Sequence, residues 1–175
     1  MAQNRGKKFE RQIKEDISKV HNVSIDRIND QTTHYRGSTN ICDFIVYKKP
    51  YEYYIECKSV HGNTLSIHSV PKPDKHGTLH GFYGNISDAQ WEGLLEKSKI
   101  KGVVAGVLCW WVDKDITRFL SIQDLQLARD FGDKSIRFDE PYLPIFGKKK
   151  RVFFEYDFNL FFYAIEKYKR KEESQ

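Results

Sequence analysis

Asp43, Glu56 and Lys58 are the residues best suited to chemistry, because their types and spacing can place two acids and an amine together. They lie in two runs rich in β-branched and aromatic residues, which predict two strands joined by a turn at Lys49-Pro50. With that turn at the centre of an antiparallel hairpin, the numbers of opposed residues sum to 99, so Asp43 falls opposite Glu56. Opposed Cβ atoms are about 4.5–5.5 Å apart, and carboxylates at that separation repel unless a cation lies between them.

Lys58 follows Glu56 by two residues, so its side chain projects from the same face of the strand. A carboxylate pair with an ammonium group beside it can hold Mg²⁺ and activate a water molecule. In this interpretation Asp43 and Glu56 bind the metal, and the Cys57 carbonyl is a further ligand. Lys58 then orients or deprotonates the water and stabilises charge on a phosphate. The alternative is that Glu56 and Lys58 form an ordinary surface pair.

Helices and further strands are expected around this hairpin. Helical spacing of apolar residues or a capping residue predicts helices at residues 5–20, 87–97, 123–130 and 157–170. Further strands are expected at residues 65–70, 103–112, 116–122 and 151–156. Residues 22–40 read as a loop or irregular edge, and residues 61–84 as a long functional loop. This order is best satisfied by an α/β fold with a mixed central sheet flanked by helices.

Composition agrees with a folded protein that binds a polyanion. The 175 residues are expected to form one domain, of which residues 157–175 are a basic C-terminal helix and tail. A hydrophobic content of 39% and a charged content of 30% are typical of globular proteins. The net charge of +5 is clustered, which favours a polyanionic partner, although solvated lysines that aid solubility are the alternative.

Cys42, Cys57 and Cys109 are odd in number and form no CxxC pair, which predicts buried free thiols in a reducing cytoplasm. The chain has no apolar stretch long enough to span a bilayer and no signal-peptide pattern, so a cytoplasmic protein with no membrane partner is expected. Four histidines also raise the hypothesis of a zinc site, but their spacing fits no common one: His61, His68, His76 and His80.

The spacing from Asp43 to Glu56-Cys57-Lys58 matches the D-x(n)-E-x-K signature, and the chain resembles the PD-(D/E)XK nuclease superfamily. The resemblance implies a restriction-endonuclease-like fold. A first-helix glutamate often adds a metal ligand in this superfamily, and a glutamine on the following helix often supports the site. Glu10 and Gln90 occupy these places in the chain.

Within the superfamily, the chain looks like the RecU-type Holliday-junction resolvases of Gram-positive bacteria and their phages. The resemblance covers most of the chain from residue 4 to about residue 138. It is carried by Asn4-Arg5-Gly6, Phe9-Glu10, Ser38-Thr39, Glu56-Cys57-Lys58 and Ser87-Asp88-Ala89-Gln90, and continues through residues 102–111, 119–121 and 134–136. RecU proteins carry a long stalk ahead of the catalytic aspartate, where this chain has only residues 22–40, so a compact phage-encoded relative fits.

The resemblance implies a homodimeric, Mg²⁺-dependent endodeoxyribonuclease, with Mn²⁺ as an alternative metal, that cuts opposed strands of a four-way junction in DNA recombination and repair. The catalytic candidates are Asp43, Glu56, Lys58, Glu10 and Gln90, and the metal-ligand candidates are Asp43, Glu56 and Cys57. The candidate DNA contacts are Arg5, Lys7, Arg36, Ser38, Thr39, Lys148, Lys149, Lys150 and Arg151.

Several of these residues have a second interpretation. Glu10 could face solvent, and Gln90 could serve a capping box with Ser87. Ser38 and Thr39 could be turn formers. At least one residue of Trp110-Trp111 is expected in the core, with base stacking as the alternative.

Two rival functions stay open: a nuclease that acts on flaps or duplex DNA, and a non-catalytic protein that binds junctions. Opposed carboxylates beside DNA repel phosphate unless a metal intervenes, which favours catalysis.

Overall fold

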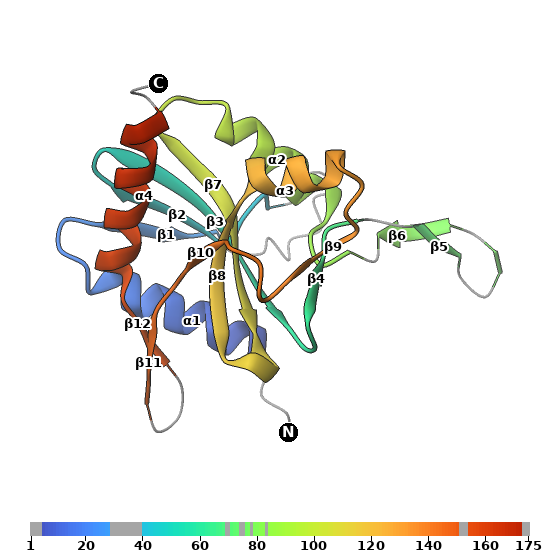
Figure 1. The fold of residues 1–175 in the computed structure, drawn as a ribbon, viewed down its shortest axis with the longest axis horizontal. Helices are drawn as coiled ribbons and strands as arrows, with labels where there is room; N and C mark the ends of the chain where they lie inside the picture. Colours follow the sequence, from blue (N-terminus) through green and yellow to red (C-terminus); the bar gives the residue numbers. More distant parts are fainter. Residues whose placement is uncertain are drawn as a thin grey trace.

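A mixed six-stranded sheet forms the centre of the protein (Figure 1). The computed structural model describes residues 5–28, 40–68, 71–73, 76–77, 79–82, 84–150 and 154–172. The sheet has the order β1 (Ser24–Arg27), β2 (Phe44–Lys48), β3 (Tyr51–Val60), β7 (Val103–Trp111), β8 (Ile116–Ser121) and β10 (Leu143–Pro144). Strands β3 and β7 are parallel, and the other neighbours are antiparallel. The predicted α/β fold with a mixed central sheet is therefore confirmed.

Helices α1 (Arg5–Ser18) and α4 (Phe158–Glu172) contribute to one apolar cluster, and α2 (Asp88–Ser98) and α3 (Ile122–Asp130) to a second. Strand β7 lies between the clusters, because Leu108 belongs to the first and Val107 and Cys109 to the second. A strand covered on both faces reads as an unbroken apolar run, as its sequence does.

The helix boundaries follow from local chemistry. Phe9, Ile13 and Ile17 of α1 are fully buried, as their helical spacing predicts. Ser87 caps α2 in a complete capping box, and the Leu160 N–H donates to Asp157 Oδ1 at 3.0 Å at the start of α4. No helix within the described ranges is long and apolar enough to cross a membrane.

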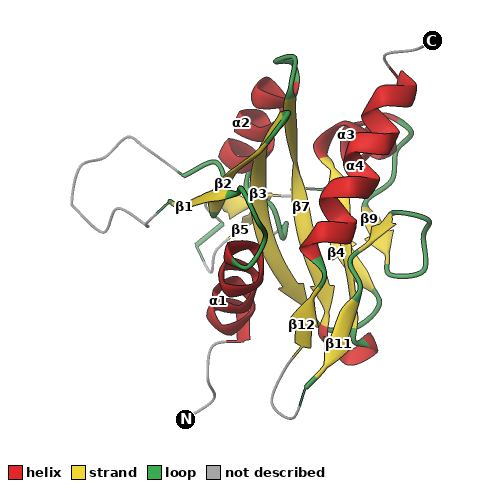
Figure 2. Cartoon of the chain, turned by 90° about the vertical axis from the view of Figure 1, so that its left-hand side faces the viewer, coloured by secondary structure: helices red, strands yellow, loops and turns green. Residues whose placement is uncertain are grey.

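Three short ribbons stand outside the central sheet. They pair β4 (Thr64–Ser66) with β9 (Ser135–Arg137), β5 (Pro71–Pro73) with β6 (Leu79–Phe82), and β11 (Gly147–Lys149) with β12 (Phe154–Tyr156). The β5–β6 ribbon projects away from the body, and α4 continues directly from the β11–β12 ribbon (Figures 1 and 2). At the base of the β5–β6 ribbon, the Asn85 N–H donates to Ser66 O at 3.3 Å and the Ser66 N–H to Asn85 Oδ1 at 2.7 Å.

Two expectations about strands require correction. Residues 61–84 hold β4, β5 and β6, whereas one strand at residues 65–70 was predicted. The loop or irregular edge expected at residues 22–40 is confirmed in part, because Ser24–Arg27 forms strand β1 at the edge of the sheet, while residues 29–39 lie outside the described residues. The strand expected at residues 151–156 is Phe154–Tyr156 and pairs with β11 outside the central sheet, while residues 151–153 lie outside the described residues.

Candidate functional site

Asp43 and Glu56 meet where strand β3 continues beyond its pairing with β2. The β2–β3 register runs from Lys48 opposite Tyr51 to Phe44 opposite Ile55, which confirms the predicted sum of 99. Asp43 directly precedes β2, and its backbone N–H donates to Ile55 O at 3.1 Å. Its Oδ2 accepts a 2.7 Å hydrogen bond from the Cys57 N–H. Beyond that point, residues 56–60 of β3 have no partner in β2, and we call this side of the strand the open edge.

Glu56 is a buried carboxylate in which, among the described residues, one oxygen accepts a hydrogen bond and the other accepts none. Its side chain is 4% exposed, and Oε1 lies 2.6 Å from Lys58 Nζ and accepts a 2.6 Å hydrogen bond from Gln90 Nε2. Oε2 is buried and accepts no hydrogen bond from the described residues. Burial raises the pKa of Glu56 to about 7; Lys58 opposes this shift, and the Asp43 charge adds to it.

Gln90 both caps α2 and binds the two charged residues of β3. Its Oε1 accepts hydrogen bonds of 3.2 Å from Lys58 Nζ and from the Ser87 N–H, while its Nε2 donates to Glu56. The capping box and the contact with the site were alternatives in the sequence, but one amide group makes both. Lys58 is thereby fixed between two oxygens on the side of β3 that faces α2.

Cys57 lies on the opposite face of β3 from Glu56 and Lys58. Its thiol is buried with the α1 and α4 cluster, and burial raises its pKa well above the usual range. Because its N–H donates to Asp43, and a strand residue presents its N–H and C=O to the same side, its carbonyl lies on the open edge. With Cys42 and Cys109 also free and buried, the prediction of buried thiols is confirmed.

Glu10 is held by a cation that the sequence did not reveal. Its Oε2 accepts a 2.5 Å hydrogen bond from Arg27 NH2, and its side chain is 18% exposed, so it is not simply a solvent-facing residue. Among the described residues, no group of three or more His, Cys, Asp or Glu side chains is arranged to hold a metal ion. Its catalytic role stays a prediction.

The predicted DNA contacts fall into separate places. Arg5 and Lys7 lie in the first turn of α1. The exposed Lys148, Lys149 and Lys150 lie in or directly after β11, where Lys149 Nζ is 3.5 Å from Asp115 Oδ2 and Lys150 Nζ is 2.7 Å from Glu155 Oε2. Four candidates lie outside the described residues: Arg36, Ser38, Thr39 and Arg151.

Two further interpretations can be judged from burial and contacts. Trp110 is 6% exposed and Trp111 is fully buried, so base stacking by either residue is wrong. His61 contacts Asp113, with 2.9 Å between Nδ1 and Oδ1, at the far end of the open edge. Asp113 and Arg27 were missed because their partners, His61 and Glu10, lie far away in the sequence.

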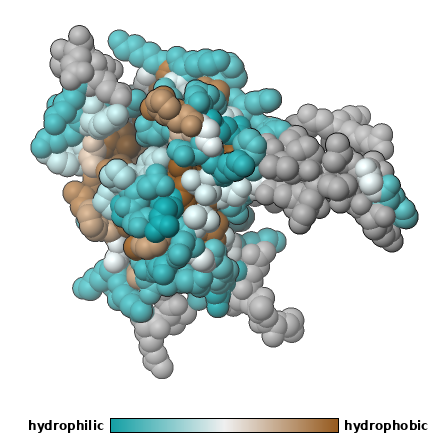
Figure 3. All heavy atoms as spheres, turned by 45° about the vertical axis from the view of Figure 1, so that its right-hand side comes forward, coloured by the Kyte–Doolittle hydropathy of each residue, from teal (hydrophilic) through white to brown (hydrophobic). Residues whose placement is uncertain are grey.

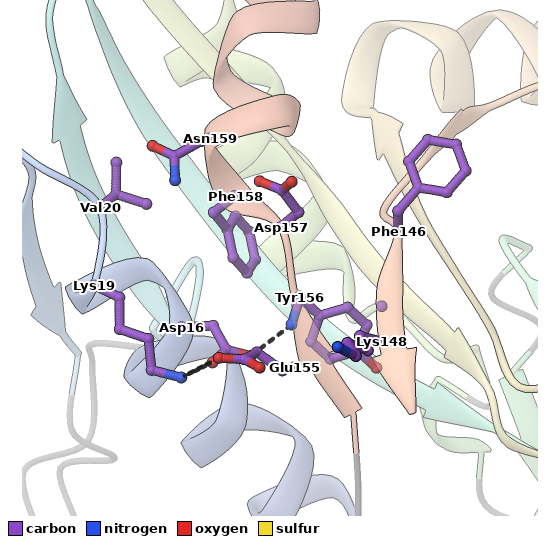
Figure 4. Close-up of a pocket in the computed structure, with 11 residues that line it drawn as sticks. Asp16, Lys19, Val20, Phe146, Lys148, Glu155, Tyr156, Asp157, Phe158 and Asn159 are labelled. Atoms are coloured by element: carbon purple, nitrogen blue, oxygen red, sulfur yellow. Dashed lines mark hydrogen bonds and ion pairs between the residues drawn. The ribbon is translucent and has the colours of Figure 1, made fainter. Parts of the chain in front are cut away.

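Asp16 is a second buried carboxylate, beside a hollow between the end of α1 and the β11–β12 ribbon (Figure 4). Its side chain is fully buried and fully bonded: Oδ2 accepts from the Tyr156 N–H at 2.8 Å and from Gln12 Nε2 at 3.0 Å, and Oδ1 accepts from Lys19 Nζ at 2.7 Å. Because every oxygen has a partner, Asp16 holds α1 to β12, and the unsatisfied carboxylate of Glu56 is the stronger candidate for chemistry.

The sequence matches no protein-family model and no curated protein. The functional conclusion therefore rests on the geometry around Glu56.

Proposed function

We propose that the chain is a Mg²⁺-dependent, structure-selective endodeoxyribonuclease of the PD-(D/E)XK type, with a restriction-endonuclease-like fold. It resolves Holliday junctions as a homodimer by hydrolysing one phosphodiester bond in each of two opposed strands. The observation that supports this best is the buried Glu56 Oε2, which lacks a partner among the described residues and belongs to a carboxylate beside Asp43 and Lys58. An unsatisfied buried carboxylate oxygen is costly, and such groups are concentrated where a ligand completes their coordination.

The donor set fits a hard divalent cation. Asp43 and Glu56 supply carboxylate oxygens, and the Cys57 carbonyl lies on the same open edge. Mg²⁺ prefers oxygen ligands and keeps several waters, so a site with two carboxylates is sufficient. When bound, the cation lowers the pKa of a coordinated water and offsets the charge of the phosphate.

Lys58 supplies the positive charge that phosphodiester hydrolysis requires. Its Nζ is held by Glu56 Oε1 at 2.6 Å and by Gln90 Oε1 at 3.2 Å, and its side chain is 20% exposed. A fixed ammonium group can donate a hydrogen bond to the attacking water or to a phosphate oxygen as charge develops there. Attack forms the new P–O bond, the bond to the leaving oxygen breaks, and that oxygen takes up a proton.

Selectivity for junctions is supported by the resemblance to RecU-type resolvases, and DNA binding by the basic groups of α1 and the β11–β12 ribbon. Phosphate contacts of this kind position DNA but carry no sequence information. The coloured part of the face shown in Figure 3 is mostly hydrophilic, with hydrophobic side chains exposed between the hydrophilic ones.

The proposal is tested by incubating labelled four-way junction, flap and linear duplex DNA with the wild-type protein, in Mg²⁺ or in a chelator. The same measurements on the Glu56→Ala variant serve as the comparison. Symmetric, Mg²⁺-dependent nicking of the junction alone, lost in the variant, is the expected result. Cutting of flaps or duplex instead would keep the chemistry and overturn the junction selectivity. Tight junction binding without cutting under any metal would overturn the catalytic function and leave a DNA-binding protein.

A further inference from the structure

A second polar cluster lies at the far end of the open edge, where the parallel strands β3 and β7 both end. It joins three elements: Arg5 opens α1, His61 and Gly62 directly follow β3, and Asp113 lies in the short 3₁₀ helix η1 (Val112–Lys114) after β7. In open α/β sheets, ligands bind preferentially beyond the carboxyl ends of parallel strands. The position of the cluster therefore suggests binding.

Asp113 organises the cluster through two hydrogen bonds. Its Oδ1 lies 2.9 Å from His61 Nδ1, and its Oδ2 accepts from the Gly62 N–H at 2.7 Å. The Gly62 N–H and His61 hold the pKa of Asp113 below its usual range, so the carboxylate is ionised and can only accept hydrogen bonds. His61 Nδ1 must then donate to it. This fixes the orientation of the ring and leaves Nε2 to face Arg5.

Arg5 NH1 and His61 Nε2 are 3.3 Å apart and form a pair of nitrogen groups at the surface. The side chains of His61 and Asp113 are 61% and 48% exposed, so their contact adds little to stability. An oriented imidazole beside a guanidinium group, both accessible, is instead suited to an anion. A phosphate oxygen can replace the imidazole as the partner of Arg5, and the imidazolium form of His61 can donate to it through Nε2.

We propose that Arg5 and His61, oriented by Asp113, form a subsite for a DNA phosphate that flanks the scissile one. The subsite rests on the proposed nuclease function. His61 lies three residues beyond Lys58, which is about 10 Å along a strand. Because neighbouring phosphates of one strand are farther apart than the axial rise of about 3.4 Å per nucleotide, the bound phosphate lies fewer than about three nucleotides from the cleaved bond. The open edge of β3 would thus contact one strand at two points.

The Asp113→Asn variant tests the subsite, because the two explanations predict opposite changes in DNA affinity. One explanation is a phosphate subsite oriented by Asp113, and the other is the charge of Asp113 alone. Removing a negative charge from a DNA-facing surface should tighten binding if charge alone matters. If Asp113 orients His61, the variant should bind a fluorescent four-way junction roughly five- to tenfold more weakly, with chelator present so that no cleavage occurs. Asp130→Asn is the charge-matched control, because Asp130 is exposed on α3, where its Oδ1 accepts a 2.8 Å hydrogen bond from Gln126 Nε2.

Arg5→Gln supplies an independent measurement in the same assay. Loss of one phosphate contact should lower the slope of log affinity against log salt by roughly 0.9. Equal or tighter binding by Asp113→Asn, or an unchanged slope for Arg5→Gln, would overturn the subsite while leaving the nuclease function untouched. If the wild-type protein binds no DNA, the proposed function fails and the subsite fails with it.

Discussion

Gln90 Nε2 donates a 2.6 Å hydrogen bond to Glu56 Oε1, and the same side chain closes the capping box at the start of α2. One amide therefore couples the beginning of a helix to the charged residues of the central strand. The position of Lys58 depends on it as well, because Gln90 Oε1 accepts from Lys58 Nζ at 3.2 Å.

Substitution of Gln90 should reduce cleavage more than it reduces stability. Gln90→Ala removes the partner of both Glu56 and Lys58, and we expect a loss of about 10- to 100-fold in kcat with little change in KM, since the amide positions groups that act in the transition state. Ser87→Ala is the matched control. It breaks the cap at a cost of about 1 kcal/mol but leaves the amide contacts of Gln90 with β3 in place. Equal loss of activity in both variants would show that Gln90 acts only through the helix.

Cleavage should increase with pH through about 7. The raised pKa of Glu56, about 7, means that protons compete with the cation for this carboxylate below neutrality. An ordinary exposed carboxylate would be ionised by about pH 5. Rates measured from pH 5.5 to 8.5 at several Mg²⁺ concentrations should show a midpoint that moves to lower pH as Mg²⁺ increases. A midpoint independent of Mg²⁺ would assign the titration to another group.

Glu56→Gln should stabilise the metal-free protein at alkaline pH. The pKa of Glu56 is raised in the folded state from 4.5 to about 7, so between these values the folded state binds more protons than the unfolded state. The contribution of Glu56 to the free energy of unfolding therefore decreases as the pH rises from about 4.5 to about 7. Above about pH 7 the Glu56 carboxyl is ionised in the folded state as well, and its contribution no longer changes. At pH 8 the variant should be more stable than wild type by on the order of 3 kcal/mol, and the difference should shrink toward pH 5.

Thermal unfolding of both proteins in chelator, at pH 5 and pH 8, measures this difference. A variant that is less stable than wild type at pH 8 would mean that the contact between Glu56 and Lys58 outweighs the cost of burying the charge.

Gly93 allows α2 to approach the segment that carries Asp43. A Cβ atom at this position would lie 2.2 Å from Ile41 Cγ2, far inside van der Waals contact. Gly93→Ala should therefore lower both stability and cleavage, although alanine favours a helix by about 1 kcal/mol over glycine. Glu92→Ala, at an exposed position of the same helix, should leave both unchanged. A fully active and more stable Gly93→Ala variant would contradict the close approach.

Asp16 should be important for stability and dispensable for cleavage. Asp16→Ala leaves the buried Tyr156 N–H without its acceptor and should reduce the free energy of unfolding by about 2–4 kcal/mol. Lys19→Ala removes the exposed amine that contacts both Asp16 and Glu155 but leaves the Tyr156 N–H with its acceptor, and it should cost about 1 kcal/mol. Urea unfolding measures both, and cleavage by Asp16→Ala at low temperature should match wild type. Similar losses in the two variants would show that the ion pair, rather than the backbone contact, is the important interaction.

The sequence predicted the centre of the fold and the arrangement of the candidate site because both are governed by local patterns. Alternation and the turn at Lys49-Pro50 were enough to set the β2–β3 register and hence to place Asp43 beside Glu56. The capping sequence from Ser87 to Gln90 marked the start of α2 correctly.

Contacts between distant elements were not predictable in the same way. The pairing of Glu10 with Arg27 depends on how α1 packs near β1, and no periodicity encodes that distance. The same holds for Asp113, which contacts His61 only because β3 and β7 are parallel neighbours that end together. The pairing of β4 with β9 and the β5–β6 ribbon were missed because these strands are very short and their partners are set by tertiary context.

The hydrogen bonds between Ser66 and Asn85 have a consequence for how this protein can vary. They bring together the two points where the chain leaves the body for the β5–β6 ribbon and returns from it. The ribbon lies in sequence between Lys58 and Gln90, yet its base is closed before either site residue is reached. Insertions, deletions or grafted segments beyond His68 and before Gly84 can therefore alter the length and chemistry of the ribbon without displacing the site. Ile67 stays outside this segment, because it is buried and its carbonyl accepts a 2.7 Å hydrogen bond from Arg129 Nε. The ribbon is a module that could be exchanged while the framework of the candidate site is retained.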